Sequence, residues 1–479
     1  MSNAPARRRR LSRLIVLSAV AVALTGCAVR RPYVAPVATA PPAWSAPGID
    51  AAVAPDATTL AQWWSAFGDP RLTSLVERAI ADSPDIKTAV SRVREARASL
   101  ASTRSTTRPT VDGAGSARQN GGDQFTQSYG LELDASWEPD LFGATASAID
   151  AASATAEARG FDLQDALVSL TAETAIDYID VRSAQQQLAL TQSNLTLQEQ
   201  TLELTQFRSQ AGLATELDVQ QALSNVESTR AQVAQLQSQL ERSRHALAVL
   251  IGQPPAALDA ELAGVAAIPS APISLAVGVP ADTLRRRPDV RSAERQLAAQ
   301  FAQVNGARAD LYPSFRLTGS IGLEALSLAK VLLPGAGFWN TGETVNTRIF
   351  NRTQLRQNVI VQTERQAQSL NTYESRVLQA LQDVEDALTS LTQEQARRDH
   401  LTAATDAAQQ SADLSLQLYT AGLQDFRTVL DAQRSLLSLQ DSVASSTAAV
   451  SEDLVRLYKA LGGGWQAADR LPKDVTAQR

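Results

Sequence analysis

The chain has 479 residues, a net charge of −6, 5% aromatic residues, one cysteine and two histidines. A single cysteine excludes an intramolecular disulfide framework, and so few Cys and His residues leave almost no basis for a Cys/His zinc cluster. The acidic balance argues against a nucleic-acid partner, which would require a basic domain or stripe. The dominance of Ala, Leu, Val, Gln and Ser favours long helices packed through small side chains.

The first 26 residues are predicted to be a signal peptide. A basic segment ending at Arg13 precedes an apolar run of eleven residues, 14–24, which is too short for a permanent membrane-spanning helix. The run ends in Leu24-Thr25-Gly26-Cys27, which resembles the bacterial lipobox. Cys27 is therefore predicted to carry diacylglycerol and an N-acyl chain. The alternative is a signal peptide cut elsewhere, with a chance free thiol.

Residues 27–56 are predicted to be a lipidated, proline-rich tether. Prolines at five positions between 32 and 47 favour an extended chain over a domain. Ala28 follows the cysteine, whereas Asp at that position commonly retains lipoproteins in the inner membrane of enteric bacteria. We therefore expect an outer-membrane location.

Two proline-free stretches, 140–253 and 335–471, indicate very long helices. Apolar residues recur in them at intervals of seven, or of three and four, which is typical of left-handed coiled coils. The recurring residues are Leu188, Leu195 and Leu202; Leu190, Leu197 and Leu204; Val226, Val233, Leu240 and Leu247; Val377, Leu381, Val384, Leu388 and Leu391; and Leu416, Leu423, Leu430 and Leu437. A helix over about 143–210 would be on the order of 100 Å long.

Two segments, 128–137 and 315–324, alternate apolar with polar residues and are predicted to be membrane β-strands. Weaker partners, 110–118 and 343–350, would complete two hairpins. Four strands are too few to close a barrel, so several chains are expected to share one. The polar faces would line a lumen through Glu132, Asp134 and Glu324, and aromatic residues at Trp137, Phe142, Trp339 and Phe350 would form an interfacial girdle.

The chain also indicates an internal duplication. Shifted by 204 residues, Pro84-Asp85 falls on Pro288-Asp289, and shifted by 210, Ala211-Gly212-Leu213 falls on Ala421-Gly422-Leu423. Each half is expected to contain a helix, a strand hairpin, a long helix, an Ala-Gly turn and a helix. The predicted repeats span 57–264 and 265–465, followed by a tail over 466–479.

Several motifs resemble those of the outer-membrane efflux protein family, the TolC-like exit ducts, and in particular the lipoprotein branch that serves RND-type pumps. They follow the lipobox and tether in the family's order: Asp69-Pro70-Arg71-Leu72, Ser83-Pro84-Asp85-Ile86, Trp137-Glu138-Pro139-Asp140-Leu141-Phe142-Gly143, Arg286-Arg287-Pro288-Asp289-Val290, Ala309-Asp310-Leu311-Tyr312-Pro313-Ser314 and Val429-Leu430-Asp431-Ala432-Gln433-Arg434. The chain departs from the family at Ile349-Phe350-Asn351-Arg352, where Gly-Gly is frequent.

The resemblance implies a mainly α-helical fold with a small transmembrane β part. Three copies would form a periplasmic α-barrel and one shared twelve-stranded β-barrel. The resemblance further implies a passive duct that carries drugs or other small molecules from the periplasm to the exterior. A periplasmic adaptor (membrane fusion) protein would join it to an inner-membrane RND-type transporter, and outer-membrane lipid would surround the barrel.

The resemblance also implies two functional regions. The turns at Gly212-Leu213 and Gly422-Leu423 would form the tip that docks the adaptor, with each glycine at positive φ where a Cβ would clash. Asp431 matches a family position that forms a carboxylate ring in the periplasmic gate, and Asp218 one that pairs across neighbouring helices. Asp425 is the next gate candidate; Thr428 occupies the usual place of a second ring carboxylate, which favours a single ring.

Catalysis is not predicted. His245 and His400 lie in coiled-coil stretches without a nearby nucleophile motif, and Gly462-Gly463-Gly464 indicates a helix end. We expect no metal site and no cofactor besides the lipid. The alternative functions are a lipoprotein duct for type I-like secretion, a periplasmic adaptor and a coiled-coil adhesin.

Overall fold

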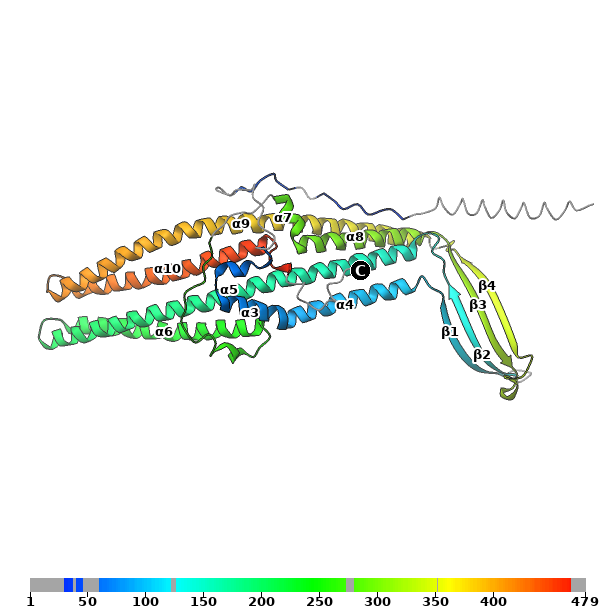
Figure 1. Cartoon of the computed structure of the whole chain (residues 1–479), viewed down its shortest axis with the longest axis horizontal. Coiled ribbons are helices and arrows are strands. Elements are labelled where there is room, and N and C mark those ends of the chain that lie inside the picture. The colour runs from blue at the N-terminus through cyan, green and yellow to red at the C-terminus, as the bar shows by residue number, and fades with distance from the viewer. Residues whose placement is uncertain are drawn as a thin grey trace, which may run out of the picture. The chain divides into compact units, whose positions relative to one another are not determined.

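The structure is a computed structural model, and it describes residues 30–37, 40–45, 60–121, 126–272, 280–350 and 352–466 (Figure 1). The predicted signal peptide, Cys27, much of the tether and residues 467–479 lie outside the described residues.

The predicted fold class is confirmed, since the described chain is mainly helical with one four-stranded sheet. The first half contains η1 (Trp63–Phe67), α3 (Pro70–Asp82), α4 (Pro84–Ser105), β1 (Thr110–Asn120), β2 (Thr126–Trp137), α5 (Ala144–Gln210), α6 (Glu216–Leu250) and η2 (Pro255–Leu258). The second half contains α7 (Pro280–Arg286), α8 (Pro288–Ala309), β3 (Ser314–Ala325), η3 (Leu328–Lys330), β4 (Gly337–Asn346), α9 (Arg352–Thr420) and α10 (Phe426–Ala460). The order helix, hairpin, long helix, helix therefore occurs twice.

The long helices have local causes. α5 runs for 67 residues and α9 for 69 without an internal proline, as predicted for the first of them. The Asp140 carboxylate accepts a hydrogen bond from the Ala146 backbone N–H at 2.7 Å, which satisfies one free donor at the start of α5. The motif at Asp69 works in the same way, because its side chain accepts from Arg71 N and Leu72 N and caps α3.

The chain divides into two compact units that cut across the two repeats. One contains residues 1–37, 92–160 and 291–375, and the other contains residues 38–91, 161–290 and 376–479. The exact boundaries of the sequence repeats stay a prediction.

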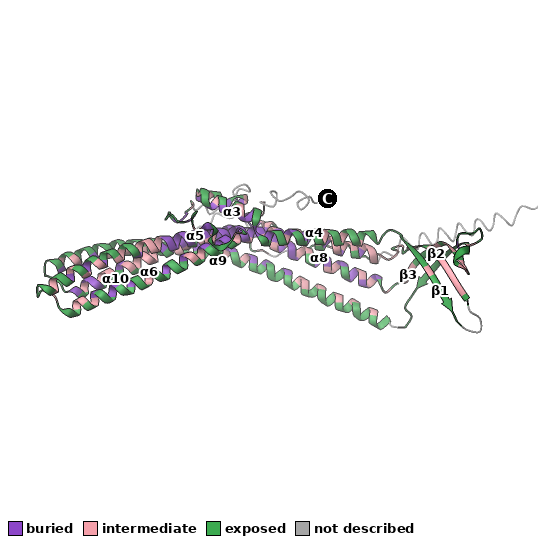
Figure 2. Ribbon diagram, turned by 90° about the horizontal axis from the view of Figure 1, so that it is seen from below, coloured by how far each residue is buried: buried purple, intermediate pink, exposed green. Residues whose placement is uncertain are grey.

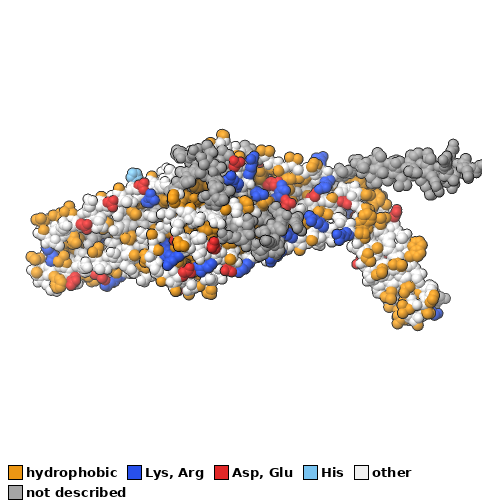
Figure 3. Space-filling model, in the orientation of Figure 1, with side chains coloured by type: hydrophobic (Ala, Val, Ile, Leu, Met, Phe, Trp, Pro, Cys, Tyr) orange, Lys and Arg blue, Asp and Glu red, His pale blue; other side chains and the backbone are white. Residues whose placement is uncertain are grey.

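The first unit contains the sheet, in which neighbouring strands are antiparallel in the order β1-β2-β3-β4. Register places Leu133 opposite Gly113 on one side and Ile321 on the other, so apolar residues share one face. Asp134 lies opposite Asp112 and Ser320 on the other face. Hydrophobic side chains gather over the strands in Figure 3.

The prediction for the fourth strand is wrong in position. β4 is Gly337–Asn346, whereas the predicted strand was 343–350. Ile349 and Phe350 therefore lie beyond the strand, exposed at 73% and 90%. The segment 337–342 was missed because Gly337, Asn340, Thr341 and Gly342 weaken the alternation, and pairing with β3 supplies the order that local preference does not.

Part of the predicted tether packs against helices of the first unit. The Tyr33 ring meets Phe301 edge-on at 5.6 Å, and its hydroxyl lies 3.5 Å from the Glu294 carbonyl oxygen. The Asn305 amide donates to the Arg31 carbonyl oxygen at 2.9 Å. Residues 30–37 have no regular secondary structure, as predicted for an extended segment, but they are docked on α8.

The second unit has a dense core where α5 passes α3 (Figure 2). Trp63 is 1% exposed and stacks on Tyr458 of α10 with ring centroids 5.5 Å apart. The Tyr178 hydroxyl donates to the Asp69 carboxylate at 2.7 Å and links α5 to the cap of α3. The motif at Asp69 therefore both starts a helix and fastens it to the bundle.

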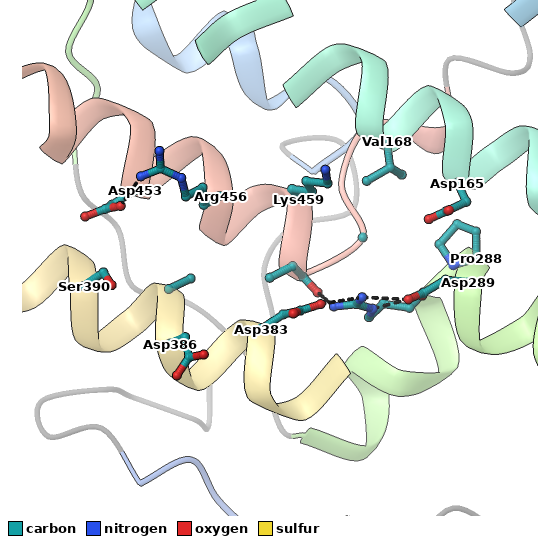
Figure 4. Close-up of a pocket in the computed structure, with 14 residues that line it drawn as sticks. Asp165, Val168, Pro288, Asp289, Asp383, Asp386, Ser390, Asp453, Arg456 and Lys459 are labelled. Carbon is teal, nitrogen blue, oxygen red and sulfur yellow. Dashed lines mark hydrogen bonds and ion pairs between the residues drawn. The ribbon is translucent and has the colours of Figure 1, made fainter. Parts of the chain in front are cut away.

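The motif Arg286-Arg287-Pro288-Asp289-Val290 has a structural role, because its Arg287 links three helices. Its guanidinium pairs with Asp289 at 2.7 Å and with Asp383 at 2.8 Å, and it donates to the Ala460 carbonyl oxygen at 3.1 Å (Figure 4). These bonds join the start of α8 to α9 and α10 beside a cavity of about 420 Å³. Burial raises the pKa of Asp165, which also lines this cavity, to about 6.

Among the described residues, no helix combines the length and apolar character needed to cross a membrane.

Candidate functional site at the tips of the helical hairpins

The two Ala-Gly turns join α5 to α6 and α9 to α10, and both lie at the same end of the second unit (Figure 1). Gly212 has φ +73° and Gly422 has φ +74°. In each turn the glycine N–H donates to the carbonyl three residues back, and the following leucine N–H donates to the carbonyl five residues back. This pair of bonds is the Schellman helix end, which needs a left-handed residue at the glycine position.

The prediction that a Cβ would clash at these two glycines is wrong. A Cβ built on Gly212 or Gly422 meets no atom within 4 Å. Glycine is therefore required by the backbone angle alone. Open space at both positions reflects turns that project from the bundle.

The helices after the turns begin with side-chain caps. At the first turn, Thr215 caps α6 and Asp218 returns a bond, with its carboxylate accepting from the Thr215 N–H at 2.8 Å. At the second turn, Asp425 caps α10 and accepts from the Thr428 N–H at 3.0 Å and the Thr428 hydroxyl at 2.8 Å. Asp and Thr have exchanged places between the repeats. In both turns the N-cap side chain accepts from the backbone N–H three residues on, and the first turn adds the reciprocal bond of a capping box.

These contacts engage two of the three predicted gate residues, Asp425 and Asp218. The Thr428 hydroxyl and backbone N–H hold the pKa of Asp425 below its ordinary value. The carboxylates of Asp425 and Asp218 thus serve the caps of their own helices. Asp431 is different: its side chain is 65% exposed and lies 3.9 Å from the Arg427 guanidinium, a loose contact one helical turn away. No contact within the single chain tests the three gate roles, which stay predictions.

The tips expose apolar side chains. Leu213 is 68% exposed and Leu423 is 74% exposed, and Leu217 in the first turn of α6 is 65% exposed. Beneath them, a small core contains Ala222, Tyr419, Phe426, Val429 and Leu430. The exposed leucines therefore stand on a packed base.

Arg208 links the two hairpins next to the turns. Its guanidinium lies over the Tyr419 ring at 4.6 Å and donates to the Thr420 carbonyl oxygen at 3.2 Å. An arginine there satisfies a free carbonyl at the end of α9 and adds a cation–π contact. Sequence reasoning missed this residue, although a basic residue in the last turn before Ala-Gly is a recognisable signal.

A second link lies deeper in the bundle. The Arg434 Nε donates to the Asn225 amide oxygen at 3.0 Å and joins α10 to α6. The neighbouring Gln433 amide lies 3.3 Å from the Thr201 hydroxyl of α5. Arg434 ends the motif Val429-Leu430-Asp431-Ala432-Gln433-Arg434, which resembles the family, but its partner Asn225 could not be identified without the packing of α6.

The predicted apolar seams are largely buried on α6 and α9, where Val226, Leu240, Leu247, Val377, Val384, Leu388 and Leu391 are at most 6% exposed. On α5 the buried positions differ from the prediction. Thr191, Gln198 and Thr205 recur at sevens along α5 and are 0%, 5% and 0% exposed. The predicted leucines of α5 are less buried than these polar residues, with Leu197 51% exposed. α5 therefore buries polar residues on the same stretch as Leu202, which packs against the apolar core that contains Tyr419, Phe426 and Leu430.

Comparison with known proteins identifies the family. The family model described as outer membrane efflux protein matches residues 75–253 and 279–463. The chain is 34% identical over 429 residues to the pyoverdine export outer membrane protein OpmQ of Pseudomonas aeruginosa, with 86% of this chain and 89% of that protein covered. It is 32% identical over 453 residues to nodulation protein T of Rhizobium leguminosarum bv. trifolii, with 92% and 95% covered.

A solved structure of the outer-membrane channel OprN matches with a TM-score of 0.86 and 34% identity, covering 92% of this chain and all of that one. The family model accounts for both repeats, and the similar structure spans the sheet as well as the helices. The chain therefore belongs to the outer membrane efflux protein family.

Proposed function

We propose that three copies of this outer-membrane efflux channel close one duct, which ends at the hairpin tips. The observation that carries the proposal is the open sheet. Among the described residues, β1 and β4 each pair with one neighbour, so each leaves one edge unpaired. Unpaired edges are avoided in natural proteins, and pairing β1 of one copy with β4 of the next removes all of them.

The number of strands and the two faces of the sheet support the same arrangement. Three sheets of four strands make a twelve-stranded barrel, which lies in the range of outer-membrane barrels. The face with Leu131, Leu133 and Ile321 then contacts lipid, and the face with Glu132 and Asp134 lines the lumen. The three apolar residues are 53–63% exposed in the single chain.

Exposed apolar residues on the long helices support contacts between copies. Leu197 and Phe207 of α5 are 51% and 59% exposed, and Leu414 of α9 is 55% exposed. Leucines that recur at sevens form helix–helix seams. Because these side chains are exposed in the single chain, they serve the contact with the next copy.

The hairpin tips dock a periplasmic adaptor, which joins the duct to an inner-membrane RND-type transporter. Leu213 and Leu423 supply apolar contacts on rigid turns, which favours binding because little ordering is needed. The channel itself is passive, and the transporter supplies the energy.

Asp431 forms the gate. In a trimer its exposed carboxylate occurs three times around one axis, and such a ring favours cations. Arg208 and Arg434 hold the two hairpins of each copy together behind this ring. The gate opens when these links release.

Cys27 anchors the N-terminus through its acyl chains, each of which contributes about 0.8 kcal/mol per buried CH₂ group. The docked segment 30–37 begins three residues later. Labelling with radioactive palmitate tests this part: Cys27→Ser should abolish the label, and a persistent label would show that the cysteine is not the acylation site.

Native mass spectrometry of the detergent-extracted protein tests the trimer. The expected mass is three times that of the processed chain, with heat needed to release the monomer. A dimer or a monomer as the largest species from outer-membrane fractions would contradict the proposal.

A further inference from the structure

Outside the tips, the structure brings together one histidine and two carboxylates that no sequence motif groups. Glu241 and His245 lie four residues apart on α6, and Asp259 follows η2. One potential ligand atom from each of the three side chains lies within 4.8 Å of the others. Spacing of four residues puts Glu241 and His245 on one helix face, and the fold of η2 brings Asp259 to that face.

Rigid surroundings hold these three groups in place. Leu258 and Leu262, on either side of Asp259, are both fully buried, and so are Leu247 and Ile251 at the end of α6. The turn between α6 and η2 has Gly252 at φ +71°, against the Asp82 carbonyl oxygen. The position of Asp259 relative to α6 is therefore fixed by packing and not by the charged groups themselves.

The Asp259 carboxylate has an unsatisfied oxygen. Its Oδ1 is buried and has no hydrogen-bond partner among the described residues. A buried carboxylate oxygen without a donor is costly, and a bound cation would remove that cost. This observation is independent of the grouping of the three side chains.

A nearby arginine orients one of the ligands. Arg244 donates to Glu241 Oε1 at 2.8 Å and to the Leu262 carbonyl oxygen at 2.9 Å. It thus ties Glu241 to the same loop that carries Asp259. Hydrogen bonds of this kind orient carboxylate ligands in metal sites.

We propose that Glu241, His245 and Asp259 bind a divalent transition metal, with Zn²⁺ as the ion best suited to them. One imidazole and two carboxylates match the ligand preferences of Zn²⁺, whereas Ca²⁺ and Mg²⁺ prefer all-oxygen sets. Three protein ligands leave a fourth position for water. The ion fastens the segment 252–264 to α6.

The two histidines of the chain allow a clean test. His400 is exposed on α9 and supplies the matched control. The full-length channel in detergent is stripped with EDTA and titrated with ZnCl₂ by calorimetry, alongside His245→Ala, Asp259→Asn and His400→Ala. The expected result is one Zn²⁺ per chain for wild type and His400→Ala, with affinity at least tenfold weaker in the other two variants.

Hydrogen exchange provides a second readout. Zn²⁺ should slow amide exchange over 252–264 in wild type and in His400→Ala, but not in His245→Ala. Equal Zn²⁺ affinity in wild type and His245→Ala, or absence of a bound Zn²⁺ in wild type, would overturn the proposal. Loss of the site in His400→Ala with His245 intact would also overturn it. The trimer mass of each variant shows that it has folded.

Discussion

Glycines with the same backbone angle differ in their surroundings. Gly212 at the tip and Gly252 after α6 have φ of +73° and +71°, but a Cβ on Gly252 would lie 2.6 Å from the Asp82 carbonyl oxygen. Gly212→Ala should destabilise the protein by about 1–2 kcal/mol, the cost of a left-handed L-residue. Gly252→Ala should cost more, because the backbone must also shift.

Urea unfolding of the two variants in the same detergent checks this order. The Gly252→Ala midpoint should be the lower of the two. Equal midpoints would show that the Asp82 carbonyl moves away freely.

Asp431 is the residue on which the gate proposal depends. Asp431→Asn keeps the shape and removes three charges from the ring, so the preference of the channel for cations should fall several-fold. Reversal potentials in a salt gradient across planar bilayers measure this. Asp399→Asn on α9, an exposed residue paired with Arg398, is the matched control and should retain the preference. Unchanged selectivity in Asp431→Asn would remove it from the gate.

Asp177 of α5 makes the stability of the folded protein depend on pH. Burial, and then the charge of Glu173, raises the pKa of Asp177 to about 6 in the folded protein. The unfolded chain has the lower pKa, so the folded state binds more protons and stability increases as pH falls from about 6 toward 4. Asp177→Asn should therefore raise the melting temperature most above pH 7, with a gain that shrinks at lower pH. A gain independent of pH would contradict the role of ionisation.

At the scale of single residues, the sequence predicted the turn glycines but not their partners. Ala-Gly-Leu between two periodic stretches is a local signal, and a helix end follows from it. Arg208, Asn225 and the carboxylate of Asp259 act through residues distant in sequence. Their contacts depend on which helices pack together, which periodicity does not specify.

The strands provide a test at the scale of elements. Leu133 and Asp134 are neighbours that face opposite sides of the sheet. Leu133→Arg would place a charge in lipid, at a cost of about 2–4 kcal/mol near the bilayer midplane. Asp134→Arg would face the lumen, opposite Asp112. Only the first should reduce heat-modifiable protein in the outer-membrane fraction; equal loss of both would contradict the assignment of the two faces.

The coiled-coil prediction succeeded for the helices and for most seam residues of α6 and α9, but it chose the wrong positions on α5. Helix length depends on local features, namely the missing prolines and the caps, and α5 begins one residue from the predicted start. The buried seam of α5 contains Thr191, Gln198 and Thr205 in place of the leucines. Hydrophobic periodicity marks every apolar face of a helix, including a face that contacts another copy of the chain. It therefore cannot separate contacts within a chain from contacts between chains.

For the assembly of the complete channel, the number of predicted strands was the most informative feature of the sequence. Four strands cannot close a barrel, and this alone predicts a shared structure. The docking of residues 30–37 on α8 could not be predicted, because prolines specify an extended chain without specifying the surface beneath it. The duplication was predictable, since the turn glycines recur at a fixed interval of 210 residues.

We propose that links through Arg208 and Arg434 close the duct of the trimer at its hairpin tips. Single-channel conductance in planar bilayers tests it directly, with wild type compared with the double variant Arg208→Ala/Arg434→Ala. Wild type should conduct weakly, and the variant should show a conductance several-fold larger at the same trimer mass. Equal conductance in the two proteins, or a variant trimer that does not conduct, would show that these links do not close the duct.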